Sequence, residues 1–373
     1  MKIGIMTYWG THDNYGQVLQ CYALIKLLND NGHEAFLIRY NRHQDIRKSS
    51  KLTLIKRYAS ISGIKSLLKR CINKHHLKKE LFADFRKFKD FYDLYIPSTT
   101  YIYDSLIELQ KNPPKADVYI SGSDQIWNFW NLPLKQYRNP IHAYFLDFGD
   151  KSIKRISVAS SWGVNNLPKE YVEEISSLIQ NYDYVSVREK NGLDLCRLCG
   201  VEKPEWIVDP TLFLSKTMYK ELFNNYSSPK INSKFLFVYI LNLNFSTDID
   251  SIYDFASRKN LEVILVTGND LVINKKRSFA TMQDWLWYIE NAEYVLTNSF
   301  HGTVFSLIFQ KKVGILKNKM KTFDSRFDSL FEILGLKNDR YIFENDFTIL
   351  DKEPECISDV SYFREKVLKE VCL

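Results

Sequence analysis

Apolar segments that alternate with helical segments constrain the fold of this chain most strongly. Residues 2–8 have the pattern of a buried strand, a polar loop follows over 9–15, and residues 16–28 carry apolar side chains at helical spacing. Residues 34–40 then form a second strand pattern. This order is a βαβ unit, whose crossover helix places the two strands parallel in one sheet. The loop contains no GxGxxG sequence, so it does not predict a dinucleotide-binding fingerprint.

The same alternation continues through the chain and predicts two domains. Further strand patterns cover 117–121, 155–160, 184–188, 205–208, 235–241, 262–267, 294–298 and 313–316. Residues 214–234 are polar with little strand character, and 373 residues suit two domains at roughly 100–200 residues each. We therefore expect an α/β protein with two Rossmann-like domains facing a cleft. The domains would span 1–213 and 235–373, with a linker region over 214–234 and a final helix able to cross back to the first domain.

One segment differs sharply from the rest in charge. The chain has a net charge of +7, yet residues 42–89 hold 15 Lys/Arg against 3 Asp/Glu, so the remainder is mildly acidic. Apolar residues recur at helical spacing over 52–72 and 80–92, which predicts a basic helical insertion at about 42–93 in the first domain. One interpretation is a solvated Lys/Arg face; the other is peripheral contact with an anionic membrane or a lipid-linked anionic glycan. No recognition motif for nucleic acid accompanies the charge.

The rest of the composition is that of an ordinary folded protein. The hydrophobic fraction is 45% and the charged fraction 25%, and the first residues read as a strand rather than a signal peptide, so we expect a cytoplasmic protein. Cys196 and Cys199 form a lone CxxC pattern without a second ligand pair, and we expect both to pack inside a helix. We expect no metal and no cofactor.

Polar loops that follow predicted strands hold the candidate functional residues. Residues 298–303 run from a strand end through Ser299, His301, Gly302 and Thr303 into a helix start. A helix N-terminus with free N–H groups favours a phosphate, and His301 beside it could transfer a proton near neutral pH. The alternative is that Ser299 or Thr303 caps the helix and His301 lies on the surface.

A second loop, residues 122–128, offers a carboxylate and an indole. Asp124 could accept hydrogen bonds from sugar hydroxyls or act as a base, and Trp127 could cover the apolar face of a sugar ring. The alternative is a helix cap at Asp124 or Ser123 with Trp127 in the core. Arg188, Arg326 and Arg340 follow strand patterns and are candidate phosphate or carboxylate ligands, although a surface ion pair is the commoner explanation for any single one of them.

Five segments together resemble the polysaccharide pyruvyl transferase family. They are Lys2–Thr7 with Asn14-Tyr15-Gly16, Gly122–Asn128, Val187-Arg188-Glu189, Asp209–Leu212 and Ser299–Thr303. Their order matches, and the resemblance covers nearly the whole chain except the basic insertion. It implies two Rossmann-like domains arranged as in GT-B glycosyltransferases. It also implies transfer of a pyruvyl group from phosphoenolpyruvate, a co-substrate, to a sugar of a cell-surface polysaccharide or its lipid-linked precursor, as a ketal across two hydroxyls with release of phosphate.

The resemblance also suggests roles for individual residues. His301 would be the general acid and Asp124 would orient or deprotonate the acceptor. The donor would be held by Ser299, Gly302, Thr303, Arg188 and Arg326, and the acceptor by Asn14, Tyr15, Gly16, Ser123, Gln125 and Trp127.

The sequence departs from the family pattern at one position. Family members carry Arg-Leu-His where this chain has Ser299-Phe300-His301, so either Arg188, Arg326 or Lys319 replaces that arginine or the donor differs. Two other functions therefore stay open. One is a GT-B-type glycosyltransferase that uses a nucleotide-sugar donor, and the other is a non-catalytic glycan-binding protein of the same family.

Overall fold

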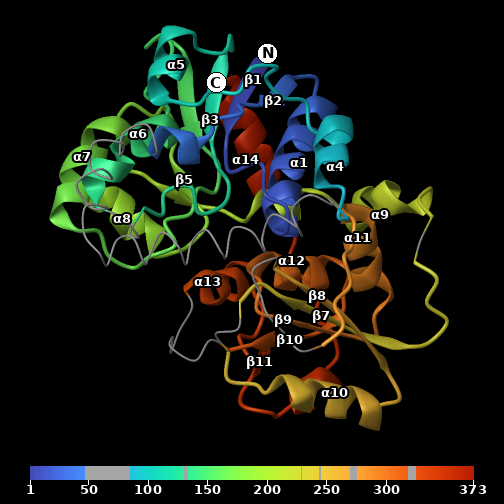
Figure 1. Ribbon diagram of the computed structural model, residues 1–373. Helices are drawn as coiled ribbons and strands as arrows, with labels where there is room; N and C mark the ends of the chain where they lie inside the picture. The colour runs from blue at the N-terminus through green and yellow to red at the C-terminus, as the bar shows by residue number, and fades with distance from the viewer. Residues whose placement is uncertain (47–84, 130–132, 228, 243–244, 269–274, 318–324) are drawn as a thin grey trace, which may run out of the picture.

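The architecture consists of two parallel β-sheets flanked by helices, seen in a computed structural model (Figure 1). The structure describes residues 1–46, 85–129, 133–227, 229–242, 245–268, 275–317 and 325–373. The predicted helix over 52–72, most of the basic insertion and Lys319 lie outside these residues. The expected α/β class with two Rossmann-like domains is confirmed.

The N-terminal sheet has the strand order β2-β1-β3-β4, with all strands parallel. Isolated bridges from Ile156 to Tyr184 and from Ser160 to Val187 add a short parallel pair, β5 and β6, beside β4. The strands are β1 (Lys2–Met6), β2 (Glu34–Leu37), β3 (Val118–Ser121), β4 (Lys154–Ser157), β5 (Ser186–Val187) and β6 (Glu205–Trp206). The helices of this part are α1 (Tyr15–Asp30), α4 (Phe88–Tyr95), α5 (Leu106–Lys111), α6 (Leu134–Tyr144), α7 (Lys169–Ile179) and α8 (Gly192–Leu198), followed by the 3₁₀ helix η1 (Pro210–Phe213).

The C-terminal sheet has the order β11-β10-β9-β7-β8 and is also parallel. Its strands are β7 (Phe235–Ile240), β8 (Glu262–Thr267), β9 (Tyr294–Thr297), β10 (Lys312–Leu316) and β11 (Tyr341–Ile342). Its helices are α10 (Ile249–Arg258), α11 (Met282–Asn291), α12 (Phe300–Ile308) and α13 (Ser325–Ile333), with the 3₁₀ helix η2 (Thr348–Asp351). Helix α9 (Lys216–Asn224) lies inside the polar segment 214–234 and packs against α11.

The strand order places two loops at topological switch points. In the first sheet β1 lies between β2 and β3, and in the second sheet β7 lies between β8 and β9. In each sheet the chain therefore adds strands first on one side of the central strand and then on the other. Ligands of open α/β sheets bind beyond the carboxyl ends of the strands at such points. The loop after β3 begins at Gly122 and the loop after β9 leads directly to His301, so both candidate loops occupy switch points.

The two domains share one apolar core instead of meeting only at a polar surface. Tyr15 at the start of α1 stacks on Trp285 of α11, with ring centroids 5.2 Å apart, and its hydroxyl donates to the Ala280 carbonyl at 2.6 Å. Figure 1 shows the last helix, α14 (Ser361–Cys372), running back into the N-terminal domain, so both termini lie there. An ion pair of 3.0 Å between Lys366 and Glu205 holds α14 in that position.

Candidate active site

The site forms where the N-termini of α1 and α12 meet, one from each domain. Gly16 lies in the first turn of α1 and His301 in the first turn of α12. A Cβ built on Gly16 would lie 2.1 Å from Cγ and 2.3 Å from Nδ1 of His301, so the imidazole occupies the space that a side chain would fill. His301 is buried, with 5% of its surface exposed, which excludes the alternative that it is a surface residue.

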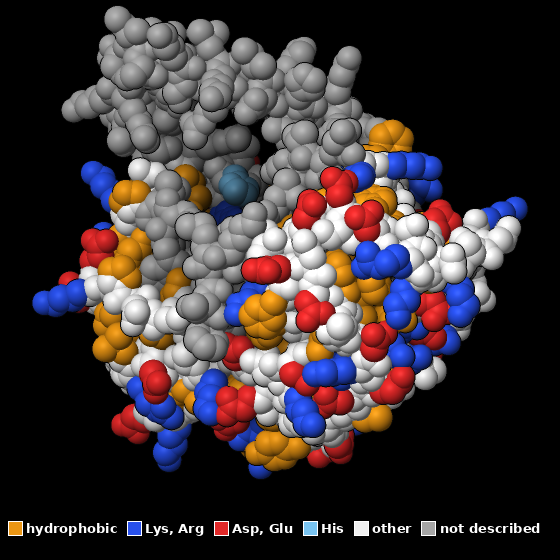
Figure 2. All heavy atoms as spheres, turned by 90° about the horizontal axis from the view of Figure 1, so that it is seen from below, with side chains coloured by type: hydrophobic (Ala, Val, Ile, Leu, Met, Phe, Trp, Pro, Cys, Tyr) orange, Lys and Arg blue, Asp and Glu red, His pale blue; other side chains and the backbone are white. Residues whose placement is uncertain are grey.

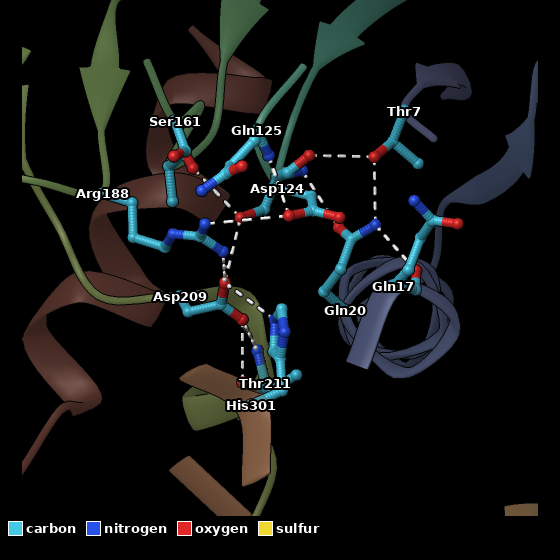
Figure 3. Close-up of polar contacts among 12 residues, drawn as sticks. Thr7, Gln17, Gln20, Asp124, Gln125, Ser161, Arg188, Asp209, Thr211 and His301 are labelled. Carbon is cyan, nitrogen blue, oxygen red and sulfur yellow. Dashed lines mark hydrogen bonds and ion pairs between the residues drawn. The ribbon is translucent and has the colours of Figure 1, made fainter. Parts of the chain in front are cut away.

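The Asp209 carboxylate is the hub of the polar contacts in this region (Figure 3). Its Oδ2 atom accepts a 2.8 Å hydrogen bond from Nη1 of Arg188 and lies 3.4 Å from Nε2 of His301. The Ser123 hydroxyl lies 3.1 Å from the same oxygen. Oδ1 accepts hydrogen bonds from the backbone N–H and the hydroxyl of Thr211, at 3.0 and 2.7 Å. Asp209 therefore joins two loops of the N-terminal domain to the helix that carries His301.

The charge of Asp209 is held in place by its cationic neighbours. Burial alone raises the pKa of this carboxyl, but His301 and Arg188 outweigh burial and hold that pKa well below its usual range. The carboxylate is thus ionised at neutral pH. It places a negative charge 3.4 Å from Nε2 of His301.

Arg188 lies inside the N-terminal domain among acidic side chains. Its guanidinium is buried and is surrounded by three carboxylates, with Asp209 at 2.8 Å and Asp124 and Glu189 each at 3.7 Å. It also lies over the Phe300 ring, 4.4 Å from the centroid. These acidic groups compensate its charge, and the donor-binding role predicted for Arg188 stays a prediction. Arg188 links the loop of Asp124 to the hub at Asp209.

Two neighbours hold the Asp124 carboxylate in a defined orientation, the Gln125 N–H and the Arg188 guanidinium. The backbone of Asp124 is left-handed, with φ of 71°, a conformation that is uncommon outside glycine but that Asp adopts more readily than most residues. Oδ1 accepts a 2.8 Å hydrogen bond from the Gln125 N–H and faces Arg188. The carboxylate also contributes to the raised pKa of the Tyr8 phenol, so it lies within electrostatic reach of the loop after β1.

The N-terminus of α12 is capped from within the chain. The Ser299 hydroxyl accepts a 3.2 Å hydrogen bond from the Gly302 N–H, and the Thr303 N–H and hydroxyl both donate to the Ser299 carbonyl. All three residues are buried. The alternative that Ser299 caps the helix is thus what this structure shows, and the donor-binding roles of Ser299, Gly302 and Thr303 stay predictions. Gly302 serves close packing, since a Cβ there would lie 2.5 Å from Oγ1 of Thr297.

Three of the six predicted acceptor residues are fully buried in this structure. Trp127 is fully buried and stacks on Phe145, with centroids 4.8 Å apart, so no face of its ring is open to a sugar. Ser123 is fully buried and its hydroxyl contacts Asp209. Tyr15 is fully buried in the domain interface. Packing and internal contacts therefore account for these three residues without a ligand, and their acceptor roles stay predictions.

The other predicted acceptor residues lie close to the site. Asn14 is half-buried, and its side chain caps α1 by accepting from the Gln17 N–H at 3.2 Å. Gly16 supports His301, as described above. The Gln125 side chain accepts a 3.4 Å hydrogen bond from the side-chain amide of Asn128, beside Gly163.

The predicted donor ligand Arg326 lies at the start of α13, next to Phe327. The Phe327 ring packs against Phe300, the residue before His301, with centroids 6.0 Å apart. Arg340 has a structural role: it is buried and donates to the Glu353 carbonyl at 2.8 Å and to Glu355 at 3.1 Å.

Sequence reasoning did not assign a role to Asp209 or Glu189. Both follow strand ends, and the Asp209-Pro210 pair marks such an end in the sequence, which was the available signal. Glu189 is buried beside Arg188 and accepts a hydrogen bond from the Ser161 hydroxyl.

Among the described residues, no group of three or more His, Cys, Asp or Glu side chains could hold a metal ion. No helix in the described ranges is sufficiently long and apolar to cross a bilayer.

Comparison with known proteins identifies a family and a fold. A family model described as polysaccharide pyruvyl transferase matches residues 14–319 of this chain. No curated protein sequence matches it. Among solved structures, UDP-GlcNAc 2-epimerase from Methanocaldococcus jannaschii is 14% identical, with coverage of 100% of this chain and 99% of that chain and a TM-score of 0.56. UDP-N-acetylglucosamine 2-epimerase from Rickettsia bellii is 12% identical, with coverage of 100% and 96% and a TM-score of 0.54. These likenesses show the GT-B-type fold.

Proposed function

We propose, from the premise that the chain belongs to the polysaccharide pyruvyl transferase family, that it moves the pyruvyl group of phosphoenolpyruvate onto a sugar as a ketal. The acceptor sugar would belong to a cell-surface polysaccharide or its lipid-linked precursor. The observation that carries this proposal is the pairing of His301 with Asp209, at 3.4 Å, at a switch point of the second sheet. This pairing supplies the buried, charge-compensated acid that the chemistry needs.

His301 gives a proton to the methylene carbon of phosphoenolpyruvate in the first step. Its Nε2 faces Asp209, so the proton would leave from Nδ1, the edge that a side chain at position 16 would cover. Protonation makes the methyl group and leaves an oxocarbenium-like carbon, to which a first sugar hydroxyl adds. A second hydroxyl then attacks the same carbon while the bond from that carbon to the phosphate oxygen breaks. One hydroxyl proton restores His301 and the other leaves with inorganic phosphate.

Asp124 would accept a proton from the attacking hydroxyl or orient it. The Arg188 guanidinium, 3.7 Å from Oδ1 of Asp124, would hold the carboxylate in place for this role. Arg188 thus acts on the acceptor side of the reaction through Asp124.

The anionic donor requires cations, because Asp124, Glu189 and Asp209 together exceed the charge of Arg188. We propose Arg326, on the helix that packs against Phe300, as one donor ligand. Arg86 is a second candidate: it is buried at the carboxyl end of β8, where Nη2 donates to the Thr267 carbonyl at 2.8 Å. Its Nε and Nη1 atoms have no hydrogen-bond partner in the part of the chain that the structure describes.

A lipid-linked acceptor would bring the protein from the cytoplasm to the inner face of the membrane. We propose that the basic segment 42–89, most of which lies outside the described residues, supplies this contact through its excess of Lys and Arg. Flotation with anionic and with neutral liposomes tests the proposal. Association with anionic liposomes alone is expected, and equal behaviour with both kinds of liposome contradicts it.

A glycosyltransferase with a nucleotide-sugar donor is the alternative function. The observation that favours it is the fold shared with an epimerase solved in complex with UDP-GlcNAc and UDP. A purely glycan-binding protein would bind neither donor.

Donor binding distinguishes these functions. The midpoint of thermal unfolding is measured with phosphoenolpyruvate, UDP and UDP-GlcNAc, since a ligand at 100 times its dissociation constant stabilises the native state by about 2.7 kcal/mol. We expect a rise with phosphoenolpyruvate that His301→Ala and Arg326→Gln diminish. A rise with UDP-GlcNAc and none with phosphoenolpyruvate would assign the glycosyltransferase function instead.

A further inference from the structure

A polar cavity opens on the N-terminal domain at the loop after β1, and the reaction proposed above does not yet use it. It has a volume of about 600 Å³ and is lined by the loop after β1, the first turn of α1 and the segment after β2. Tyr8, Trp9, Asn14, Gln17, Asn41 and Arg42 contribute side chains to it. All three segments lie at the carboxyl ends of β1 and β2, next to the switch point of the first sheet.

The lining offers the groups that recognise a sugar. Trp9 is half-buried, and its indole N–H donates to the Tyr40 carbonyl at 2.8 Å, which fixes the ring. Indole and phenol rings cover the apolar faces of sugars, while the side-chain amides of Gln17 and Asn41 can donate to and accept from hydroxyls. The volume is large enough for a small saccharide.

Arg42 adds a positive charge to this wall. Its guanidinium lies over the Tyr8 ring, 4.1 Å from the centroid, and is half-buried. No carboxylate among the described residues lies within 4.0 Å of it, unlike Arg188. Asp13 also lines the cavity, but its Oδ1 accepts from the Thr11 hydroxyl at 3.2 Å and its Oδ2 lies toward Gly268 of the other domain. The cavity thus combines a stacked guanidinium, suited to an oxyanion, with a sugar-binding wall.

Tyr8 connects this cavity to the candidate active site. Its phenol contacts Arg42 on one side, and the Asp124 carboxylate contributes to its raised pKa of about 12, after burial as the largest cause. The phenol therefore stays neutral and able to donate a hydrogen bond. A sugar in the cavity would have the Asp124 carboxylate within electrostatic reach.

We infer that this cavity binds a sugar that carries an oxyanion, with Arg42 as the ligand of the oxyanion and Trp9 against the ring. In the reaction proposed above, this sugar is part of the acceptor, so its role as acceptor rests on that proposed function. The binding itself does not require phosphoenolpyruvate. The oxyanion has two sources in glycans: the carboxylate of a uronic acid or the phosphate of a glycosyl phosphate, as at the lipid-linked end of a precursor.

Calorimetric titration of the full chain without donor tests the inference. The probes are the uronates, the 1-phosphates and the methyl glycosides of glucose, galactose and mannose. We expect at least one anionic probe to bind tenfold more tightly than its methyl glycoside. Preference for uronates or for 1-phosphates identifies the source of the oxyanion. The inference is overturned if no anionic probe binds, or if every anionic probe binds only as tightly as its methyl glycoside.

Three variants complete the test. Arg42→Gln is expected to remove the preference for anions while retaining weak binding of the ring, and Arg42→Lys to keep part of the preference. Lys151→Gln removes an equal charge from a separate cavity and is expected to change nothing. A preference that survives Arg42→Gln overturns the assignment. Because these titrations contain no donor, loss of anionic-sugar binding and loss of phosphoenolpyruvate binding are separate results, and each proposal can fail alone.

Discussion

The imidazole of His301 fills the space where a side chain on Gly16 would stand, with only 2.1 Å between a built Cβ and Cγ of the ring. This contact joins the first turn of α1 to the first turn of α12, and so joins the two domains at the point proposed for proton transfer. Residue 16 must lack a side chain for His301 to keep its position beside Asp209.

Gly16→Ala should therefore displace His301 without unfolding the protein. A displacement of about 1 Å at a reacting group can cost about 100-fold in rate, and overpacking of a buried contact costs about 1–3 kcal/mol. We expect phosphate release from phosphoenolpyruvate with acceptor glycan to fall by about 100-fold. The control is Gly32→Ala, at a position with φ of 82° and open space around it. Gly32→Ala should lower the stability of the protein but leave phosphate release unchanged. Equal losses of phosphate release in Gly16→Ala and Gly32→Ala would contradict the account.

Removal of the Asp209 carboxylate should destabilise the protein strongly. Asp209→Asn leaves the charge of buried Arg188 only partly compensated, and breaking a buried ion pair costs about 3–5 kcal/mol. In a denaturant series with Asp209→Asn, Arg188→Met and the double variant, the losses should be less than additive, as for residues in direct contact. Strictly additive losses would show that the pair does not interact.

The same pair predicts a pH dependence. The pKa of Asp209 is held below its usual range, against burial, by His301 and Arg188, so its contribution is complete above the unfolded-state value of about 3.9 and declines as the pH falls. The difference in unfolding free energy between the wild type and Asp209→Asn should shrink as the pH falls below about 4, where the unfolded-state carboxyl takes up its proton. A difference that grows on acidification would reverse the assigned sign.

His142 should give the opposite pH dependence, remote from the site. Its pKa is raised mainly by a 2.6 Å hydrogen bond with Asp147, and also by Glu174 at 2.6 Å, against burial. The stability from a raised pKa is complete below the unfolded-state value of about 6.5 and is lost as the pH rises through the folded-state pKa. His142→Gln should thus cost more at pH 5.5 than at pH 8.5 in urea unfolding. Asp147→Asn should weaken that dependence, and a cost independent of pH would contradict the pairing.

Local patterns predicted the positions of the loops but not the partners of their side chains. The βαβ alternation placed the loops with Asp124 and His301 at strand ends, and parallel sheets brought both to switch points. Local patterns could not show that the charge of Arg188 is compensated, because two of its carboxylate partners, Asp124 and Asp209, lie up to 64 residues away in sequence. The role of Asp209 could not be predicted from local patterns for the same reason, because its contact with His301 joins the two domains.

Trp127 shows why an aromatic residue in a polar loop is ambiguous. The loop pattern suits a sugar-binding indole, but the ring stacks on Phe145 and packs against Trp162. Trp127→Ala should therefore cost about 3–5 kcal/mol of stability, as for a large buried side chain. Trp127→Phe should retain most of the donor and acceptor affinity. A tenfold loss of sugar affinity in a stably folded Trp127→Phe variant would support the acceptor role.

The most direct test of the proposed reaction is the fate of the pyruvyl group. The protein is incubated with phosphoenolpyruvate labelled in its carbon atoms and with glycan and lipid-linked precursor extracted from cells that lack the protein. We predict that label enters the glycan, that mild acid releases it as pyruvate, that one phosphate forms per pyruvyl group transferred, and that His301→Ala abolishes all three. Unlabelled glycan under these conditions, together with transfer of sugar from a nucleotide sugar to the same extract, would contradict pyruvyl transfer.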